Sequence, residues 1–223
     1  MSRSNPYPEE PRGGLFSPLL EAAVRLAARG HHNQFRKSVE DPEGDSPSGV
    51  FLADRVPYVT HLMGTMCILA RLGARDEVLA AAVLHDYLED VPDPDGRDNI
   101  RQVLGEEVLS LVLEVTEDKH RGLKKADTWE IRKQEQIDHL ARMTEEAVLI
   151  KAADVLHNVQ SLTLDLKAAG DVDVVWQHFN AGPERQLWYF ASVTEAVENR
   201  LGKHPLAADL RLAVEKLRAA LNP

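Results

Sequence analysis

Cysteine is almost absent from this chain of 223 residues, in which Cys67 is the single example. One thiol cannot form an internal disulfide, so the sequence excludes the disulfide-stapled folds of secreted proteins and is typical of a reducing compartment. Met66, Ile68 and Leu69 surround Cys67 in the sequence. This apolar setting predicts a buried, unreactive thiol.

Long apolar runs and an excess of basic residues are also missing. No apolar stretch is long enough to span a bilayer and the first residues lack the apolar core of a signal peptide, so we expect a cytoplasmic protein without a membrane partner. Lysine and arginine total 26 against 36 aspartates and glutamates, a net charge of −10. Because nucleic-acid surfaces need a basic excess, we expect no nucleic-acid partner. A local basic pocket for a phosphorylated small molecule stays compatible with this balance.

The alternation of apolar and polar residues that marks strands is missing as well, whereas helical spacing recurs along the chain. Ser17 and Pro18 form a good N-cap and first turn for a helix that ends near residue 32. Further helices are expected over residues 57–72, 98–104, 106–117, 129–143, 145–167 and 183–201, with a last amphipathic helix ending near residue 221. The sequence therefore predicts an all-α bundle with additional C-terminal helices.

Composition divides the chain into three parts. Residues 1–16 contain three prolines and two adjacent glycines and predict a mobile tail. Residues 17–201 form the main domain, interrupted by a polar segment over 39–57 that we expect to be a flexible loop. Residues 202–223 are expected to form a C-terminal helix packed on that domain.

The stretch Ala80–Asp90, AAAVLHDYLED, places a cluster of ionisable side chains at the end of an apolar segment. Alanine and leucine favour a helix and the stretch holds no glycine or proline, so we predict one continuous helix. On it, His85 and Glu89 lie one turn apart, as do Asp86 and Asp90. Three crowded carboxylates repel one another and are costly to bury unless a cation or hydrogen bonds compensate. A solvated helix end is the plainer interpretation.

Two other predicted helices each carry a residue that is awkward in its position. His61 shares the apolar stripe of residues 57–72, and Asp154 lies inside the apolar helix 145–167. The plainer interpretation of His61 is a core histidine whose ring nitrogens are hydrogen-bonded within the protein. With His85 and Asp86, however, these residues offer two imidazoles and two carboxylates, a set that suits Mn²⁺, Fe²⁺, Co²⁺ or Zn²⁺. An ion held there would make the water that it binds easier to deprotonate.

Three segments carry a resemblance to a known family: PYVTHLMGTMCILARLGARDEVLAAAVLHDYLEDV, EVTEDK and IKAADVLHNVQSL. The pattern H…HD…D resembles the metal signature of the HD phosphohydrolases, and the longer segments resemble the hydrolase domain of RelA/SpoT enzymes and their metazoan homologues. The resemblance runs from about Leu20 to Leu164. It implies an HD-domain helical bundle over residues 17–201 that removes the 3′-pyrophosphate of the alarmones ppGpp and pppGpp, using Mn²⁺ or another divalent transition metal.

The resemblance also implies roles for individual residues. It implies metal ligation by His61, His85, Asp86 and Asp154. It implies that Glu89 and Asp90 orient or deprotonate the attacking water. It implies substrate contacts from Arg36, Lys37, Lys151 and Asn158, with a structural role as the alternative for Lys151 and Asn158. Val91 stands where the family usually has threonine, and this departure bears on the choice of substrate.

Two alternatives to alarmone hydrolysis stay open at this stage. The chain could hydrolyse another nucleotide, since the lining of a pocket and not its metal ligands selects the substrate. It could also be a catalytically silent nucleotide sensor. Glu89 and Asp90 speak against the sensor, because a module that only binds has no need of carboxylates crowded beside a metal. The sequence leaves both a monomer and a homodimer open.

Overall fold

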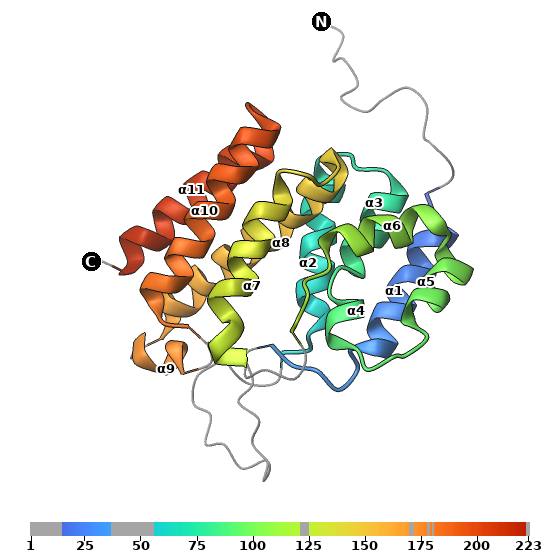
Figure 1. The fold of residues 1–223 in the computed structure, drawn as a ribbon, viewed down its shortest axis with the longest axis horizontal. Coiled ribbons are helices and arrows are strands. Elements are labelled where there is room, and N and C mark those ends of the chain that lie inside the picture. Colours follow the sequence, from blue (N-terminus) through green and yellow to red (C-terminus); the bar gives the residue numbers. More distant parts are fainter. Residues whose placement is uncertain are drawn as a thin grey trace, which may run out of the picture.

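The computed structural model describes residues 15–36, 56–120, 125–169, 172–177, 179 and 181–221, and their regular structure is helical (Figure 1). Over these ranges the chain forms no strand, and the single bridge pairs Phe35 with Pro57. The prediction of an all-α fold is confirmed. Nearly all of the predicted tail, most of the predicted 39–57 loop and Lys37 lie outside the described residues. No described helix is long and apolar enough to cross a membrane.

The first half of the fold contains the helices α1 (Pro18–Gly30), α2 (Val59–Arg71), α3 (Asp76–Val83), α4 (Tyr87–Asp90), α5 (Gly96–Leu104) and α6 (Glu106–Val115). Ser17 caps α1 as predicted, since its hydroxyl accepts a hydrogen bond from the backbone nitrogen of Leu20. All residues from Val78 to Leu84 are buried, and α3 packs against α1, α2 and α6. The apolar segment that precedes the charged cluster therefore lies in the core.

The second half contains α7 (Lys125–Leu140), α8 (Glu145–Ala168), α9 (Val172–Trp176), α10 (Pro183–Leu201) and α11 (Pro205–Leu221). The long helix α8 joins the two halves, because it packs against α2, α3 and α6 on one side and against α10 and α11 on the other. Figure 1 shows α10 and α11 side by side at the end of the molecule away from α1 and α5. Side chains of α8 can therefore contact helices from both halves.

The prediction of one continuous helix through Ala80–Asp90 is wrong. The helix α3 ends at Val83, and the four-residue helix α4 starts at Tyr87. Leu84 and Asp86 have ψ angles of 6° and 0°, in the region between helix and strand where many active-site residues occur. The backbone nitrogens of Leu84 and Tyr87 bond three residues back, to Ala81 and Leu84. This tight turn replaces the regular helical ladder.

Cys67 is also placed differently from the prediction. Its side chain is exposed on α2 and forms no disulfide. The prediction assumed that Cys67 shares the burial of its apolar neighbours in sequence. Successive residues of a helix point in different directions, so this assumption failed. Leu62, Thr65 and Leu69 supply the buried face of α2, and Cys67 lies outside it.

Candidate active site

The break between α3 and α4 lets two adjacent residues, His85 and Asp86, face the same point. The Nδ1 atom of His85 donates a hydrogen bond to the carbonyl oxygen of Ala82 at 2.7 Å, which fixes the ring and its tautomer. The Nε2 atom of His85 is buried and has no hydrogen-bond partner. Asp86 is oriented by Tyr58, whose hydroxyl donates to Asp86 Oδ2 at 2.6 Å. Each of the two side chains is thus oriented by a group outside the pair, His85 by Ala82 and Asp86 by Tyr58.

His61 from α2 and Asp154 from α8 meet this pair. Asp154 Oδ1 lies 3.1 Å from His61 Nε2 and 3.6 Å from His85 Nε2. Asp86 Oδ2 lies 3.1 Å from His85 Nε2 and 3.7 Å from His61 Nε2. Metal–ligand bonds of about 2.1 Å at right angles would put neighbouring ligand atoms about 3 Å apart. A buried imidazole nitrogen without a hydrogen bond and two carboxylates at these spacings fit a divalent metal ion.

The electrostatics of the cluster point in the same direction. Burial lowers the pKa of His85, yet the carboxylates of Asp86 and Asp154 outweigh it and raise this pKa well above its ordinary range. Burial prevails at His61 and lowers its pKa. Although burial opposes it, the charges of Lys151 and His85 keep the pKa of Asp154 well below its usual value. The cluster therefore holds anionic oxygens that attract a cation, and a metal ion binding there would displace the additional proton of His85.

Asp154 is held from its own helix. Lys151, one turn earlier, donates to Oδ2 at 3.0 Å, and Asn158, one turn later, donates to Oδ1 at 2.7 Å. The guanidinium of Arg36 donates to Asn158 Oδ1 at 3.2 Å. Lys151 and Asn158 line the pocket, whereas Arg36 is not among the described residues that line it. The residues that the resemblance implied as substrate contacts thus include two that already hold Asp154.

Glu89 lies beside the cluster without joining the ion pairs of the imidazoles. Its Oε1 atom accepts a hydrogen bond from the backbone nitrogen of Glu117 at 2.6 Å, and its Oε2 atom lies 2.9 Å from Lys119 Nζ. Burial and, after it, the charge of Asp86 raise the pKa of Glu89 to about 7, against the opposing effect of Lys119. A carboxyl group whose pKa lies near neutrality is suited to accept and release protons. Asp90 is more exposed and lies 3.3 Å from Lys119.

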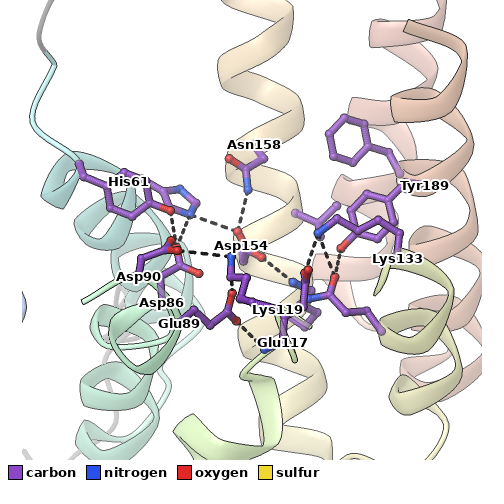
Figure 2. A pocket seen from close by; sticks show the side chains of 15 residues that line it. His61, Asp86, Glu89, Asp90, Glu117, Lys119, Lys133, Asp154, Asn158 and Tyr189 are labelled. Carbon is purple, nitrogen blue, oxygen red and sulfur yellow. Dashed lines mark hydrogen bonds and ion pairs between the residues drawn. The ribbon is translucent and has the colours of Figure 1, made fainter. Parts of the chain in front are cut away.

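These groups open into one polar pocket with a cavity of about 180 Å³. Figure 2 shows His61, Asp86 and Asp154 gathered on one side, Lys119 beside Glu89, and Lys133 with Tyr189 on the opposite side. The far wall comes from α7 and α10: Lys133 Nζ lies 2.7 Å from Glu117 Oε2 and 4.9 Å from the ring centre of Tyr189. The pocket thus combines a His/Asp cluster of the kind that binds metal ions, the carboxyl group of Glu89, whose pKa lies near neutrality, and several ammonium groups.

Several residues of the site escaped the sequence prediction. Tyr58, Lys119, Lys133 and Tyr189 line the pocket, and His157 contacts His61. Tyr58, Lys119 and His157 lie in segments that carried the family resemblance, which was the one signal that could have found them. Lys133 and Tyr189 gave no signal, because only the packing of α7 and α10 brings them to the pocket.

Comparison with known proteins identifies the family. A family model described as HD domain matches residues 49–184, more than half of the chain. The chain belongs to the HD-domain family. The prediction made from the motif H…HD…D is confirmed, and for this HD-domain protein the family and the His/Asp cluster together imply a divalent metal ion.

Two curated relatives carry the same descriptive name, guanosine-3′,5′-bis(diphosphate) 3′-pyrophosphohydrolase MESH1. The protein from Danio rerio is 36% identical over 146 residues, which cover 65% of this HD-domain chain and 68% of the relative. The protein from Drosophila melanogaster is 32% identical over 196 residues, covering 87% and 89%. A solved structure of a metazoan ortholog of SpoT, described as hydrolysing ppGpp, superposes with a TM-score of 0.63 at 28% identity and covers 94% of this chain and 99% of that one.

Proposed function

We propose that this protein is a metal-dependent hydrolase that removes the 3′-pyrophosphate from guanosine 3′,5′-bis(diphosphate) or its 5′-triphosphate analogue. The products would be GDP or GTP and pyrophosphate. The observation that carries the proposal is the meeting of two imidazole nitrogens and two carboxylate oxygens, 3.1–3.7 Å apart, at the edge of a pocket with ammonium groups. The names of the MESH1 relatives support the choice of substrate.

His61, His85, Asp86 and Asp154 would hold the ion. We propose Mn²⁺ because the resemblance to the RelA/SpoT hydrolases implies it, and the mixed nitrogen and oxygen ligands are compatible with it. The bound ion would polarise a phosphate oxygen and lower the pKa of the attacking water. The chain's own contribution is to fix the four side chains beforehand. Tyr58 holds Asp86, the carbonyl of Ala82 holds His85, and Lys151 holds Asp154.

Glu89 is the proposed base. Its carboxylate lies beside the cluster, its pKa is raised to about 7, and its two oxygens are held by Glu117 and Lys119. A held carboxylate of this basicity can take a proton from a water molecule aligned with the phosphorus atom. Asp90 shares Lys119 with Glu89 and would keep that ammonium group in place.

The ammonium groups of Lys119 and Lys133 face the pocket and would bind the oxygens of the pyrophosphate. Asn158 and Lys151 would contribute polar contacts next to Asp154. Arg36, which bonds to Asn158, and its neighbour Lys37 are proposed to bind the nucleotide at the rim. The oligomeric state that we propose is a monomer or a homodimer, with each site built from one chain.

One product analysis tests the proposal. Purified protein is incubated with ppGpp and Mn²⁺, and the nucleotides are separated and pyrophosphate is measured. We expect GDP and pyrophosphate in equal amounts, and no reaction with His85→Ala. A panel containing GTP, NADPH and deoxynucleoside triphosphates serves as the comparison. Release of phosphate from one of these with ppGpp left intact would contradict the proposed substrate, and binding of ppGpp without turnover would contradict the proposed reaction.

A further inference from the structure

His157 contacts the imidazole of His61 ring to ring at the edge of the site. Its Nδ1 atom lies 3.0 Å from Nδ1 of His61, and the two ring centres are 4.9 Å apart. His61 and Asp154 come from different helices, α2 and α8, and His157 lies one turn beyond Asp154 on α8. The ring of His157 therefore stands behind His61, on the side away from the carboxylates of Asp86 and Asp154.

A hydrogen bond between two Nδ1 atoms requires one proton and one lone pair. If Nε2 of His61 gives its lone pair to a metal ion, the proton of the neutral ring must be on Nδ1. His61 then donates to His157, and Nδ1 of His157 must carry the lone pair. The second histidine is thereby restricted to the tautomer with its proton on Nε2. The contact selects the one form of His61 that can coordinate through Nε2.

A glycine on the facing helix makes room for this ring. A Cβ atom added at Gly64, one turn after His61 on α2, would lie 2.3 Å from both Cδ2 and Nε2 of His157. Real atoms cannot approach so closely, so the ring position depends on the missing side chain. A glycine inside a helix is destabilising relative to alanine. The position of the His157 ring explains why a glycine, and not a larger residue, stands at position 64.

From the bond and the glycine together we propose that His157 is a positioning residue for the metal centre. It accepts the Nδ1 proton of His61, selects the coordinating tautomer and holds the plane of the ring, while Gly64 provides the space. Groups that bond to a metal-ligating histidine in this way raise its basicity, and their loss typically weakens metal binding about 10- to 100-fold. The proposal rests on the proposed function only in that His61 is taken as a metal ligand.

The experiment compares two substitutions of the same residue. His157→Phe keeps a planar ring but removes the acceptor, whereas His157→Asn places an amide oxygen near the former Nδ1 atom. Binding of Mn²⁺ to metal-stripped protein is measured by isothermal titration calorimetry, and thermal unfolding in EDTA reports folding. We expect His157→Phe to weaken Mn²⁺ binding about 10- to 100-fold and His157→Asn to recover most of the loss. Binding by His157→Phe within about three-fold of wild type would overturn the proposal.

Gly64→Ala provides an independent test from the opposite helix. Alanine in place of glycine stabilises an unobstructed helix, but here it should displace the His157 ring and weaken Mn²⁺ binding instead. In a His157→Asn background the same change should cost less, because the shorter side chain leaves space for the Cβ atom. A Gly64→Ala protein that gains stability and binds Mn²⁺ like wild type would contradict the proposed role.

A measurement on the wild type covers the case in which a variant does not fold. Long-range ¹H–¹⁵N spectra of Zn²⁺-loaded protein distinguish the tautomers of individual histidines. We expect the proton of His61 on Nδ1 and the proton of His157 on Nε2. A proton on Nδ1 of His157 would overturn the proposal. A wild-type protein that binds neither Mn²⁺ nor Zn²⁺ would instead contradict the proposed function.

Discussion

The backbone nitrogen of Glu117 donates a hydrogen bond to Oε1 of Glu89 at 2.6 Å. Glu117 itself is fixed by ion pairs with Arg132 and Lys133 from α7. The orientation of Glu89 therefore depends on a helix that is distant in sequence from α4. This relationship links the proposed base to the far wall of the pocket, and it makes the role of Glu89 testable apart from metal binding.

The first prediction separates the base from the ligands. Glu89→Gln preserves the volume of the side chain and one acceptor for Glu117, but it removes the basic oxygen. We expect kcat for ppGpp hydrolysis to fall by about 10²- to 10⁴-fold, with Mn²⁺ content unchanged. Steady-state kinetics and metal analysis on the same sample measure both. Glu215→Gln, on the exposed face of α11, is the matched control and should behave as wild type.

A rate for Glu89→Gln within a few-fold of wild type would leave Glu89 without a catalytic part. Loss of the metal in this variant would instead make Glu89 a ligand, and the set of four proposed ligands would be wrong.

The second prediction concerns stability and pH. The pKa of Glu89 is raised from an ordinary 4.5 to about 7, so the folded protein binds this proton more tightly than the unfolded chain does. Its contribution to stability is complete below the unfolded pKa and is lost as the pH rises through about 7. A shift of this size corresponds to about 3 kcal/mol. In Glu89→Gln this pH-dependent loss should be absent.

Urea unfolding of both proteins in EDTA, at about pH 5 and about pH 8.5, measures the difference. Wild type should lose more free energy of unfolding between these values than Glu89→Gln does. Equal pH dependence of the two proteins would show that Glu89 titrates near its ordinary pKa. The comparison is internal to each protein, so a constant cost of the substitution cancels.

The third prediction separates metal binding from folding at Asp154. Asp154→Asn should lose the metal and should also destabilise the protein in EDTA, because it removes the carboxylate charge to which the buried ammonium of Lys151 is bonded. Loss of one partner of a buried pair typically costs about 3–5 kcal/mol. Adding Lys151→Met should restore much of the stability, since the isolated charge is gone, but it should not restore metal binding.

Metal analysis and urea unfolding of the single and double variants measure these two effects. Retention of metal by Asp154→Asn would remove Asp154 from the proposed ligands. A double variant as unstable as the single one would show that the Lys151 charge is not the origin of the cost.

The fourth prediction concerns the rim of the pocket. Arg36 donates a hydrogen bond to Asn158 and is not among the described residues that line the cavity. Its loss should therefore affect binding of the nucleotide more than binding of the metal ion. Replacing Arg36 and Lys37 together by alanine should raise KM for ppGpp and leave Mn²⁺ content unchanged, because charged phosphate contacts are lost. Initial-rate kinetics measure KM, and unchanged kinetics would make the pair an ordinary surface feature.

The sequence was informative where a residue conflicts with its local setting. Asp154 inside an apolar helix and His61 on an apolar stripe both pointed inward, and both are buried beside the cluster. Helix positions followed from periodicity and from caps such as Ser17. These features depend on residues a few positions apart, which is the range over which sequence patterns carry physical information.

What the sequence could not give depends on contacts across the fold. The contact between His61 and His157 follows from how α2 packs against α8; His157 lies in a segment that carried the family resemblance, but local sequence patterns do not predict its contact with His61. Gly64 was a usable signal of close packing, because a glycine inside an apolar helix lowers helix stability and is therefore expected where a neighbouring group needs the space. The break at Leu84 was not predicted because alanine and leucine favour a helix. The turn is stabilised by the imidazole of His85 and by backbone hydrogen bonds that span three residues, and helix propensities include neither.

That break has a consequence for anyone who would engineer a hardier version of this protein. In an unbroken helix, successive side chains point about 100° apart, so His85 and Asp86 would diverge more than they do at this turn, and we expect a weaker metal site. Substitutions that lengthen α3 into α4 would look attractive to a designer who scores helix content. Each such repair would turn one of the two side chains away. The irregular backbone at this turn is what places the two proposed ligands together. We therefore expect a protein with a regular helix here to lose much of its metal binding and, with it, activity.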